Sequence, residues 1–208
     1  MSAELTAYTR LQPLQGREVP RCYGAFDFTM PWDRSVSGIV LEDLSPFGRS
    51  LPVFCAEEES TLNTVAKIGP LATALFDLVH LVHEYGVAAA MWEQANIYVL
   101  RSSTPSHPHL AVIDFGDMIP AEDVKASYRA RGLQVSRWHH GDEHRAHCSL
   151  EAEIGVVAQD WLIEVHRQDR NRYAIFGTWN DAEDEFLQLS AEAQAELVAS
   201  DSEDEAAP

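Results

Sequence analysis

Residues 86–99 read Gly-Val-Ala-Ala-Ala-Met-Trp-Glu-Gln-Ala-Asn-Ile-Tyr-Val, and residues 113–116 read Ile-Asp-Phe-Gly. Between these two motifs, the apolar segments 97–100 and 110–113 predict two short strands joined by a turn rich in Ser, Pro and His. Asn96 stands directly before the first strand, and Asp114 directly follows the second strand. The chain therefore carries an Asn-bearing loop before, and an Asp-Phe-Gly turn after, one predicted strand pair.

This layout resembles the active site of protein kinases, where an Asn follows the catalytic Asp by five residues and a strand pair leads to Asp-Phe-Gly. Here the position five residues before Asn96 holds Met91, and Ala89 and Ala90 replace the His-Arg that precedes that Asp. A thioether cannot accept a proton from a substrate hydroxyl. The resemblance implies a kinase-like domain with Met91 at the catalytic Asp position and no catalytic residue there.

Further segments extend the resemblance, which is to divergent, fungal-type protein kinase-like sequences, over roughly residues 1–120. They are residues 14–24, 39–42 and 83–87, which resemble the start of the fourth strand, the fifth strand and the end of helix E. On this alignment the chain is N-terminally truncated, because it begins after the third strand. The resemblance implies an α+β, protein kinase-like fold with a mainly helical C-lobe and a remnant N-lobe of helix C plus a β-hairpin. We expect the remnant small lobe at 1–44, the large lobe at 45–180 and an acidic, partly disordered tail at 181–208.

The family's functional residues carry over only in part. By resemblance, Asn96 and Asp114 occupy the two metal positions, and amide and carboxylate oxygens suit Mg²⁺. Glu42, Asn96 and Asp114 would line a vestigial nucleotide cleft, for which the resemblance implies ATP and Mg²⁺ as cofactors. Glu4 stands where helix C offers its glutamate to the phosphate-binding lysine. That lysine and the glycine-rich loop belong to strands before the aligned region, so neither has a counterpart here.

Three functions remain open from these residues. The first is a non-catalytic pseudokinase that acts as a binding or scaffold module for a protein partner, because phosphoryl transfer depends on the positioning and charge that are missing. The second is an ATP-dependent phosphotransferase whose N-terminal strands are missing from this chain. The third is a metal-binding protein that uses the cluster from His139 to Cys148, which holds four histidines and a cysteine in a stretch that looks like a solvated loop.

Periodicity and turn residues predict the remaining elements. The predicted helices cover residues 2–14, 57–85, 122–131, 149–166 and 186–197, and a β-hairpin is predicted at 22–28 and 37–42. Pro70 either kinks the second helix or lies in the first turn of another. The segment 44–51 is predicted to be a loop. With only two strands in its small lobe, the hairpin is expected to rest on the large lobe or on a partner.

Charge and cysteine content exclude several classes of function. The chain of 208 residues has a net charge of −18, and ten acidic residues with no Lys or Arg lie in 181–208, which leaves −8 for residues 1–180. Neither part offers the basic surface that nucleic acids or anionic membranes require. Cys22, Cys55 and Cys148 are an odd, widely spaced set, which favours a reducing compartment. We therefore expect a cytoplasmic or nuclear protein that binds neither nucleic acid nor membrane; the oligomeric state is open.

Overall fold

The computed structural model describes residues 3–32, 35–88, 92–101, 104, 107–130, 139–169, 172 and 173. Met91, with Ala89 and Ala90, lies outside the described residues, as do the acidic tail at 181–208 and the helix predicted at 186–197.

The N-terminal helix is confirmed, but it is shorter than its apolar spacing predicts. Helix α1 covers Ala3–Arg10 and passes into a 3₁₀ turn, η1, at Gln12–Leu14, where Pro13 has no backbone N–H to extend an α-helix. Gly16 then adopts a left-handed conformation with φ of +80° and reverses the chain. Tyr8 and Leu11 are fully buried in the same hydrophobic core as the C-terminal helices, so α1 rests on the rest of the protein.

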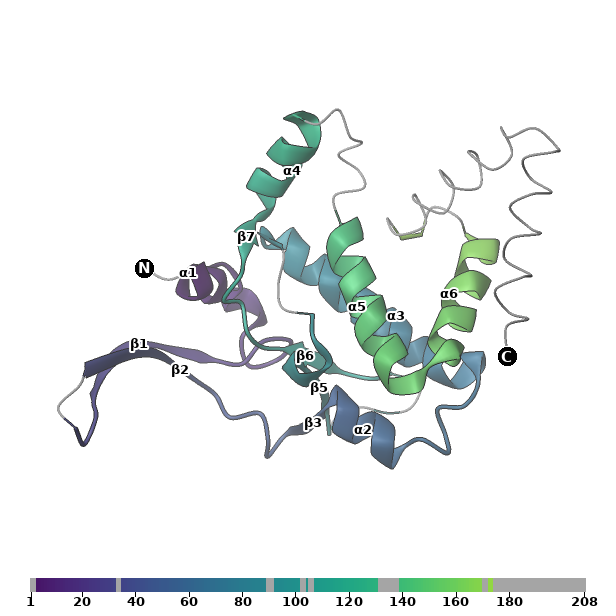
Figure 1. Ribbon diagram of the computed structural model, residues 1–208, viewed down its shortest axis with the longest axis horizontal. Helices are drawn as coiled ribbons and strands as arrows, with labels where there is room; N and C mark the ends of the chain where they lie inside the picture. Colours follow the sequence, from purple (N-terminus) through teal and green to yellow (C-terminus); the bar gives the residue numbers. More distant parts are fainter. Residues whose placement is uncertain are drawn as a thin grey trace, which may run out of the picture.

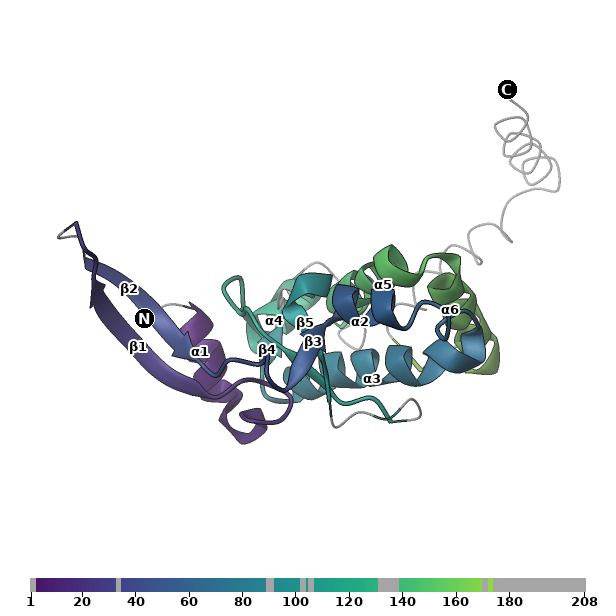
Figure 2. The same ribbon diagram turned by 90° about the horizontal axis from the view of Figure 1, so that it is seen from below.

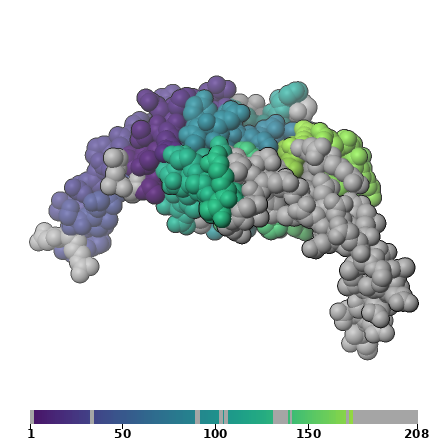
Figure 3. All heavy atoms as spheres, turned by 90° about the horizontal axis from the view of Figure 1, so that it is seen from above, coloured from purple at the N-terminus to yellow at the C-terminus, as the bar shows by residue number. Residues whose placement is uncertain are grey.

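The predicted hairpin is confirmed as strands β1 (Cys22–Thr29) and β2 (Ser35–Leu41), paired antiparallel. It extends away from the helices as a narrow arm, at the far end from α6 (Figures 1–3). Phe26 and Phe28 remain about half exposed on this arm, and their rings lie 6.4 Å apart. The hairpin therefore keeps a large apolar surface in contact with solvent.

A second sheet lies beside the helices and has the strand order β3-β5-β6. Strands β5 (Ile97–Leu100) and β6 (Leu110–Val112) are the predicted pair, and β3 (Gly48–Ser50) pairs antiparallel with β5. The prediction of a loop at 44–51 is therefore confirmed for residues 44–47 and wrong for residues 48–51. Gly48 explains the difference, because a Cβ at this position would lie 2.8 Å from the carbonyl oxygen of Val99. Only glycine allows the two backbones to approach closely enough to pair.

Two helices follow β3, and the long helix predicted at 57–85 is confirmed only in part. Helix α2 covers Leu51–Glu57, and α3 covers Val65–Glu84 with Pro70 inside it. Helix α3 is the centre of the fold, since α5 and α6 both pack along it (Figures 1 and 2). By length and composition alone α3 could cross a membrane, but such a match is weak, and core helices share it. Its buried side chains include Ile68, Leu75, Phe76 and Val82.

The C-terminal helices differ most from the prediction. Helix α4 (Ala121–Ala130), joined to the short strands β4 (Val87–Ala88) and β7 (Ile119–Pro120), matches the predicted helix at 122–131. The single helix predicted at 149–166 is instead two helices, α5 (His140–Ile154) and α6 (Val156–Gln168). Gly155 separates them with a φ of +61°, a conformation that a helix interior cannot hold. The stretch expected to be a solvated loop forms the first half of α5.

Buried polar groups explain why this stretch is helical. Asp142 and Glu143 look solvated in the sequence, yet both are buried against α3. Oδ2 of Asp142 lies 2.7 Å from Nε2 of His83, and Oε1 of Glu143 lies 2.5 Å from Nε2 of His80. A buried carboxylate requires such a partner. The two His–carboxylate pairs therefore determine how α5 sits on α3.

His139 extends this network by one further contact. Its Nδ1 contacts Nδ1 of His83, and the two rings are stacked with centroids 4.6 Å apart. Because Nε2–H of His83 donates to Asp142, Nδ1 of His83 can accept a hydrogen bond from Nδ1–H of a neutral His139. Burial, followed by the neighbouring His83 and His80, lowers the pKa of His139 to about 4. His139 is therefore neutral at physiological pH, as this chain of hydrogen bonds requires.

The depressed pKa of His139 predicts acid sensitivity. Between pH 6.5 and about 4 the unfolded state binds a proton that folded His139 does not, so the free energy of unfolding should fall as the pH is lowered. Urea titrations at several pH values measure this slope. The slope should be smaller for His139→Gln, and an identical slope in the two proteins would contradict the assignment.

Phe115 predicts a second effect on stability. Its ring is fully buried and meets Tyr8 edge-on, with centroids 5.2 Å apart. We expect Phe115→Ala to lower the free energy of unfolding by about 3–5 kcal/mol, as measured by urea unfolding with tryptophan fluorescence. Phe26→Ala, on the exposed arm, is the matched control and should cost less than about 0.5 kcal/mol. Equal losses in the two variants would rule out the core position of Phe115.

Candidate functional site

Asn96 and Asp114 lie at the same end of one strand pair. Ile97 pairs with Val112 at the last register position of β5 and β6, so Asn96 precedes one strand where Asp114 follows the other. The amide of Ile113 donates to the carbonyl of Asn96 at 3.0 Å, which extends the ladder to the site. Asn96 itself ends a 3₁₀ turn, η2 (Gln94–Asn96). The sequence motifs thus bring an amide and a carboxylate to one edge of the sheet.

Asp114 has an unusual backbone conformation. Its φ of 65° is the one positive value at a non-glycine residue in the described part of the chain. Asp tolerates this region better than most residues, and such conformations cluster at functional sites. Its Oδ1 accepts a hydrogen bond from the amide of Gly116 at 3.1 Å. This turn directs Phe115 into the core and leaves the Asp114 carboxylate at the surface of the sheet edge.

Glu4 of α1 is the third acidic group at this edge. The pKa of Glu4 is raised, first by burial and then by the negative charge of Asp114. Tyr8, one turn later on α1, packs on Phe115 and also feels the charges of Glu4 and Asp114. The helix C glutamate implied by the sequence therefore does lie near the Asp of the Asp-Phe-Gly motif. No Lys or Arg in the described part of the chain lowers the pKa of Glu4.

Glu42, the third predicted cleft residue, has a different role in the described structure. Its Oε2 accepts from the amide of Arg21 at 3.1 Å, and its own amide donates to the carbonyl of Arg21 at 2.8 Å. These bonds close the base of the β1–β2 arm. Within the described residues, no hydrogen bond joins Glu42 to Asn96 or Asp114. The Glu42 carboxylate therefore already accepts a hydrogen bond from the backbone of Arg21.

The loop that carries Met91 is anchored immediately after that residue. Trp92 is buried, and its carbonyl accepts a hydrogen bond from Oγ of Ser149 on α5. Trp92 is therefore held against α5. Met91 comes between strand β4 and Trp92 in the sequence and lies outside the described residues. The expectation that Met91 shares a pocket with Asn96 and Asp114 stays a prediction.

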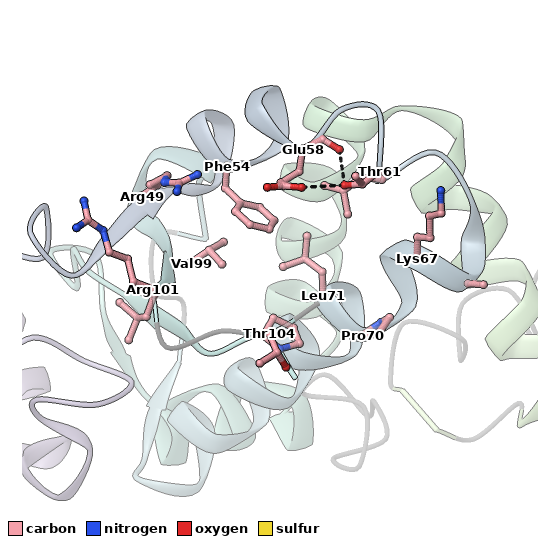
Figure 4. Close-up of a pocket in the computed structure, with 14 residues that line it drawn as sticks. Arg49, Phe54, Glu58, Thr61, Lys67, Pro70, Leu71, Val99, Arg101 and Thr104 are labelled. Carbon is pink, nitrogen blue, oxygen red and sulfur yellow. Dashed lines mark hydrogen bonds between the residues drawn. The ribbon is translucent and has the colours of Figure 1, made fainter. Parts of the chain in front are cut away.

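A cavity of about 800 Å³ lies away from this edge, between α2, α3 and β5. Figure 4 shows Phe54, Leu71 and Val99 pointing toward one another across it, with Arg49 and Arg101 on one side and Lys67 on the other. The sequence analysis missed this cavity. Its residues come from four separate segments with no common period, so only the fold brings them together.

The predicted metal cluster from His139 to Cys148 is divided by α5. His139, Asp142 and Glu143 face α3 and pair with its histidines. His144, His147 and Cys148 are not part of those pairs; Nε2 of His144 lies 3.6 Å from Sγ of Cys148. The cluster is therefore not one site, and its two parts need separate treatment.

Comparisons with known proteins give a structural match and no sequence match. No family model matches the chain, and no curated protein matches it. A solved structure described as WaaP in complex with acyl carrier protein matches with a TM-score of 0.54 and 20% identity, over 90% of this chain and 76% of that chain.

The chain shares its overall fold with this solved structure. The expectation of an α+β fold is confirmed at this level, with the helices α3, α5 and α6 packed together and three small sheets in the described part of the chain. At 20% identity the match speaks for the fold alone. The closer likeness to fungal-type sequences, and the division into lobes at residue 44, stay predictions.

The acidic edge predicts an effect of charge removal. We expect Glu4→Gln to raise the melting temperature at pH 7–8, because the raised pKa means that ionisation costs folded Glu4 more than unfolded Glu4. The gain should be at most about 1 kcal/mol and should vanish as the pH falls to the ordinary pKa of a glutamate side chain, about 4.3.

Glu122→Gln is the matched control for this prediction. Arg10 binds the Glu122 carboxylate through both terminal nitrogens, at 2.9 and 3.2 Å, and lowers its pKa to about 2. Its removal should therefore lower the melting temperature at pH 7. A destabilised Glu4→Gln protein at neutral pH would show that the charges of Glu4 and Asp114 do not oppose each other.

Proposed function

We propose that the chain is a kinase-like module that binds a protein partner and does not transfer phosphate. The observation that carries the proposal is the uncompensated charge at the acidic edge. In kinases the helix C glutamate holds a lysine that neutralises the nucleotide phosphates. Here the charge acting on Glu4 is the negative charge of Asp114. Without a cation bound at this edge, its two carboxylates would repel a phosphate group.

The sequence supports the same proposal independently. Met91 stands where the resemblance places the catalytic Asp, and a thioether neither orients nor deprotonates a hydroxyl. Loss of a general base alone costs about 10²–10⁴-fold in rate. This loss makes a binding role the better explanation of the arrangement of Asn96 and Asp114 at one end of the strand pair.

The β1–β2 arm is the surface we propose for the partner. Phe28 faces Val36 across the strands, and Phe26 lies two residues along on the same face. These side chains are 44–48% exposed, and Trp32 near the tip of the arm is 63% exposed. A two-stranded hairpin with an uncovered apolar face is marginally stable in water. A protein partner that covers this face would stabilise the arm.

A phosphotransferase that acts within a longer chain is the second candidate. The position of Asn96 and Asp114 at one end of the strand pair favours it, because this arrangement could hold Mg²⁺. Met91 and the charge at Glu4 count against it. With either function, we propose that the chain acts in the cytosol or nucleus, because Cys22, Cys55 and Cys148 are all free thiols.

Nucleotide titration separates the two candidates. We expect ATP, with or without Mg²⁺, to leave the melting temperature of the full chain unchanged and to release no labelled phosphate. A bound ligand at a hundred times its dissociation constant would stabilise the fold by about 2.7 kcal/mol, which differential scanning fluorimetry detects readily.

Asp114→Asn is the control for this titration. A Mg²⁺-dependent shift that is present in the natural chain and lost in Asp114→Asn would place the nucleotide in the cleft. Such a shift, accompanied by phosphate transfer, would overturn the proposal in favour of the enzyme.

A further inference from the structure

One face of α5 carries four potential metal ligands. His144, His147, Cys148 and Glu151 follow one another at i, i+3, i+4 and i+7, and these positions share one side of a helix. They form two pairs with i, i+4 spacing, His144 with Cys148 and His147 with Glu151. The residues of α5 that pair with α3, Asp142 and Glu143, are not members of this set.

The ligand atoms of this set converge. One atom each of His147, Cys148 and Glu151 lies within 4.8 Å of the other two. Nδ1 of His147 is 3.8 Å from Oε2 of Glu151, and Nε2 of His144 is 3.6 Å from Sγ of Cys148. A tetrahedral zinc ion, with Zn–N of about 2.0–2.1 Å and Zn–S of about 2.3 Å, sets N and S ligands about 3.6 Å apart. The His144–Cys148 and His147–Glu151 spacings are close to this value, and His144, which lies outside the group of three, would join the same ion through a side-chain movement.

The orientation of His147 also suits a metal ligand. Only 6% of the surface of His147 is exposed, and its Nε2 makes no hydrogen bond within the described structure. A proton on Nε2 leaves the lone pair of Nδ1 available to a metal ion beside Oε2 of Glu151, which lies 3.8 Å from Nδ1.

The second histidine cluster does not have these properties. His80, His83 and His139 are joined in pairs to Glu143, Asp142 and each other. Among the described residues, the one group of three ligand atoms that converges is His147, Cys148 and Glu151. The His–carboxylate pairs between α3 and α5 are therefore internal contacts, and the metal-type geometry lies on the other set.

We propose that α5 binds one divalent transition-metal ion through His147, Cys148 and Glu151, with His144 as the fourth ligand. Two nitrogens, a thiolate and a carboxylate favour Zn²⁺ over Mg²⁺ or Ca²⁺. Ser149, next to Cys148, holds the carbonyl of Trp92. A metal at this site would thereby stiffen the part of α5 that supports the loop before Asn96. The proposal stands independently of whether the chain binds ATP.

Cobalt titration of the full chain, after removal of metal by a chelator, tests the proposal. We expect one Co²⁺ per chain, with the intense visible bands of tetrahedral cobalt and a thiolate-to-cobalt charge-transfer band, and displacement of both by Zn²⁺. Cys148→Ser should abolish the charge-transfer band, and Glu151→Gln should weaken Co²⁺ binding by about tenfold or more.

Matched variants keep the test specific. Glu153→Gln, two residues further along α5, and Cys22→Ser, on β1, should leave the spectrum and stoichiometry unchanged. Far-UV circular dichroism of each metal-free variant checks that the helix is retained. Absence of tetrahedral bands in the natural chain would overturn the proposal, as would bands that persist in Cys148→Ser and disappear in Cys22→Ser.

Discussion

The buried contact between α3 and α5 is the constraint on which the rest of this fold depends. Two carboxylates, Asp142 and Glu143, are removed from water and meet His83 and His80 on the facing helix. Removing one partner of such a pair leaves a buried polar group unsatisfied, so the helices can dock in one register only. That register brings Ser149 to the carbonyl of Trp92 and so positions the loop that precedes Asn96.

A second contact joins this body to the N-terminal helix. Tyr8 of α1 meets Phe115 edge-on, and Phe115 follows Asp114 directly. Arg10 adds a polar tie, because it binds both the carbonyl of Gly86 and the carboxylate of Glu122. The site edge is thus held from two sides, by α5 through Trp92 and by α1 through Phe115.

The sequence was sufficient to predict elements whose pattern is local. The β1–β2 hairpin, the β5–β6 pair and the start of the chain as a helix all follow from short apolar or aromatic runs. The sequence also predicted that Asn96 and Asp114 lie at the same end of one strand pair, because the two strands connect one residue to the other. These predictions needed no knowledge of distant partners.

The errors arose where a distant partner decides the structure. Asp142 and Glu143 read as solvated until the histidines of α3 are placed opposite them. Gly48 reads as a loop residue until the backbone of Val99 lies against it. The cavity beside α2 is assembled from segments that share no sequence pattern.

The proline within α3 has a consequence for that cavity. A proline has no amide hydrogen, so the carbonyl of Ala66, four residues before Pro70, cannot receive its usual intrahelical bond. Ala66 and Pro70 both line the cavity, among largely apolar neighbours. The first turns of α3 therefore have one α-helical hydrogen bond fewer where they border the cavity, and their backbone is held less tightly there than in the turns that follow.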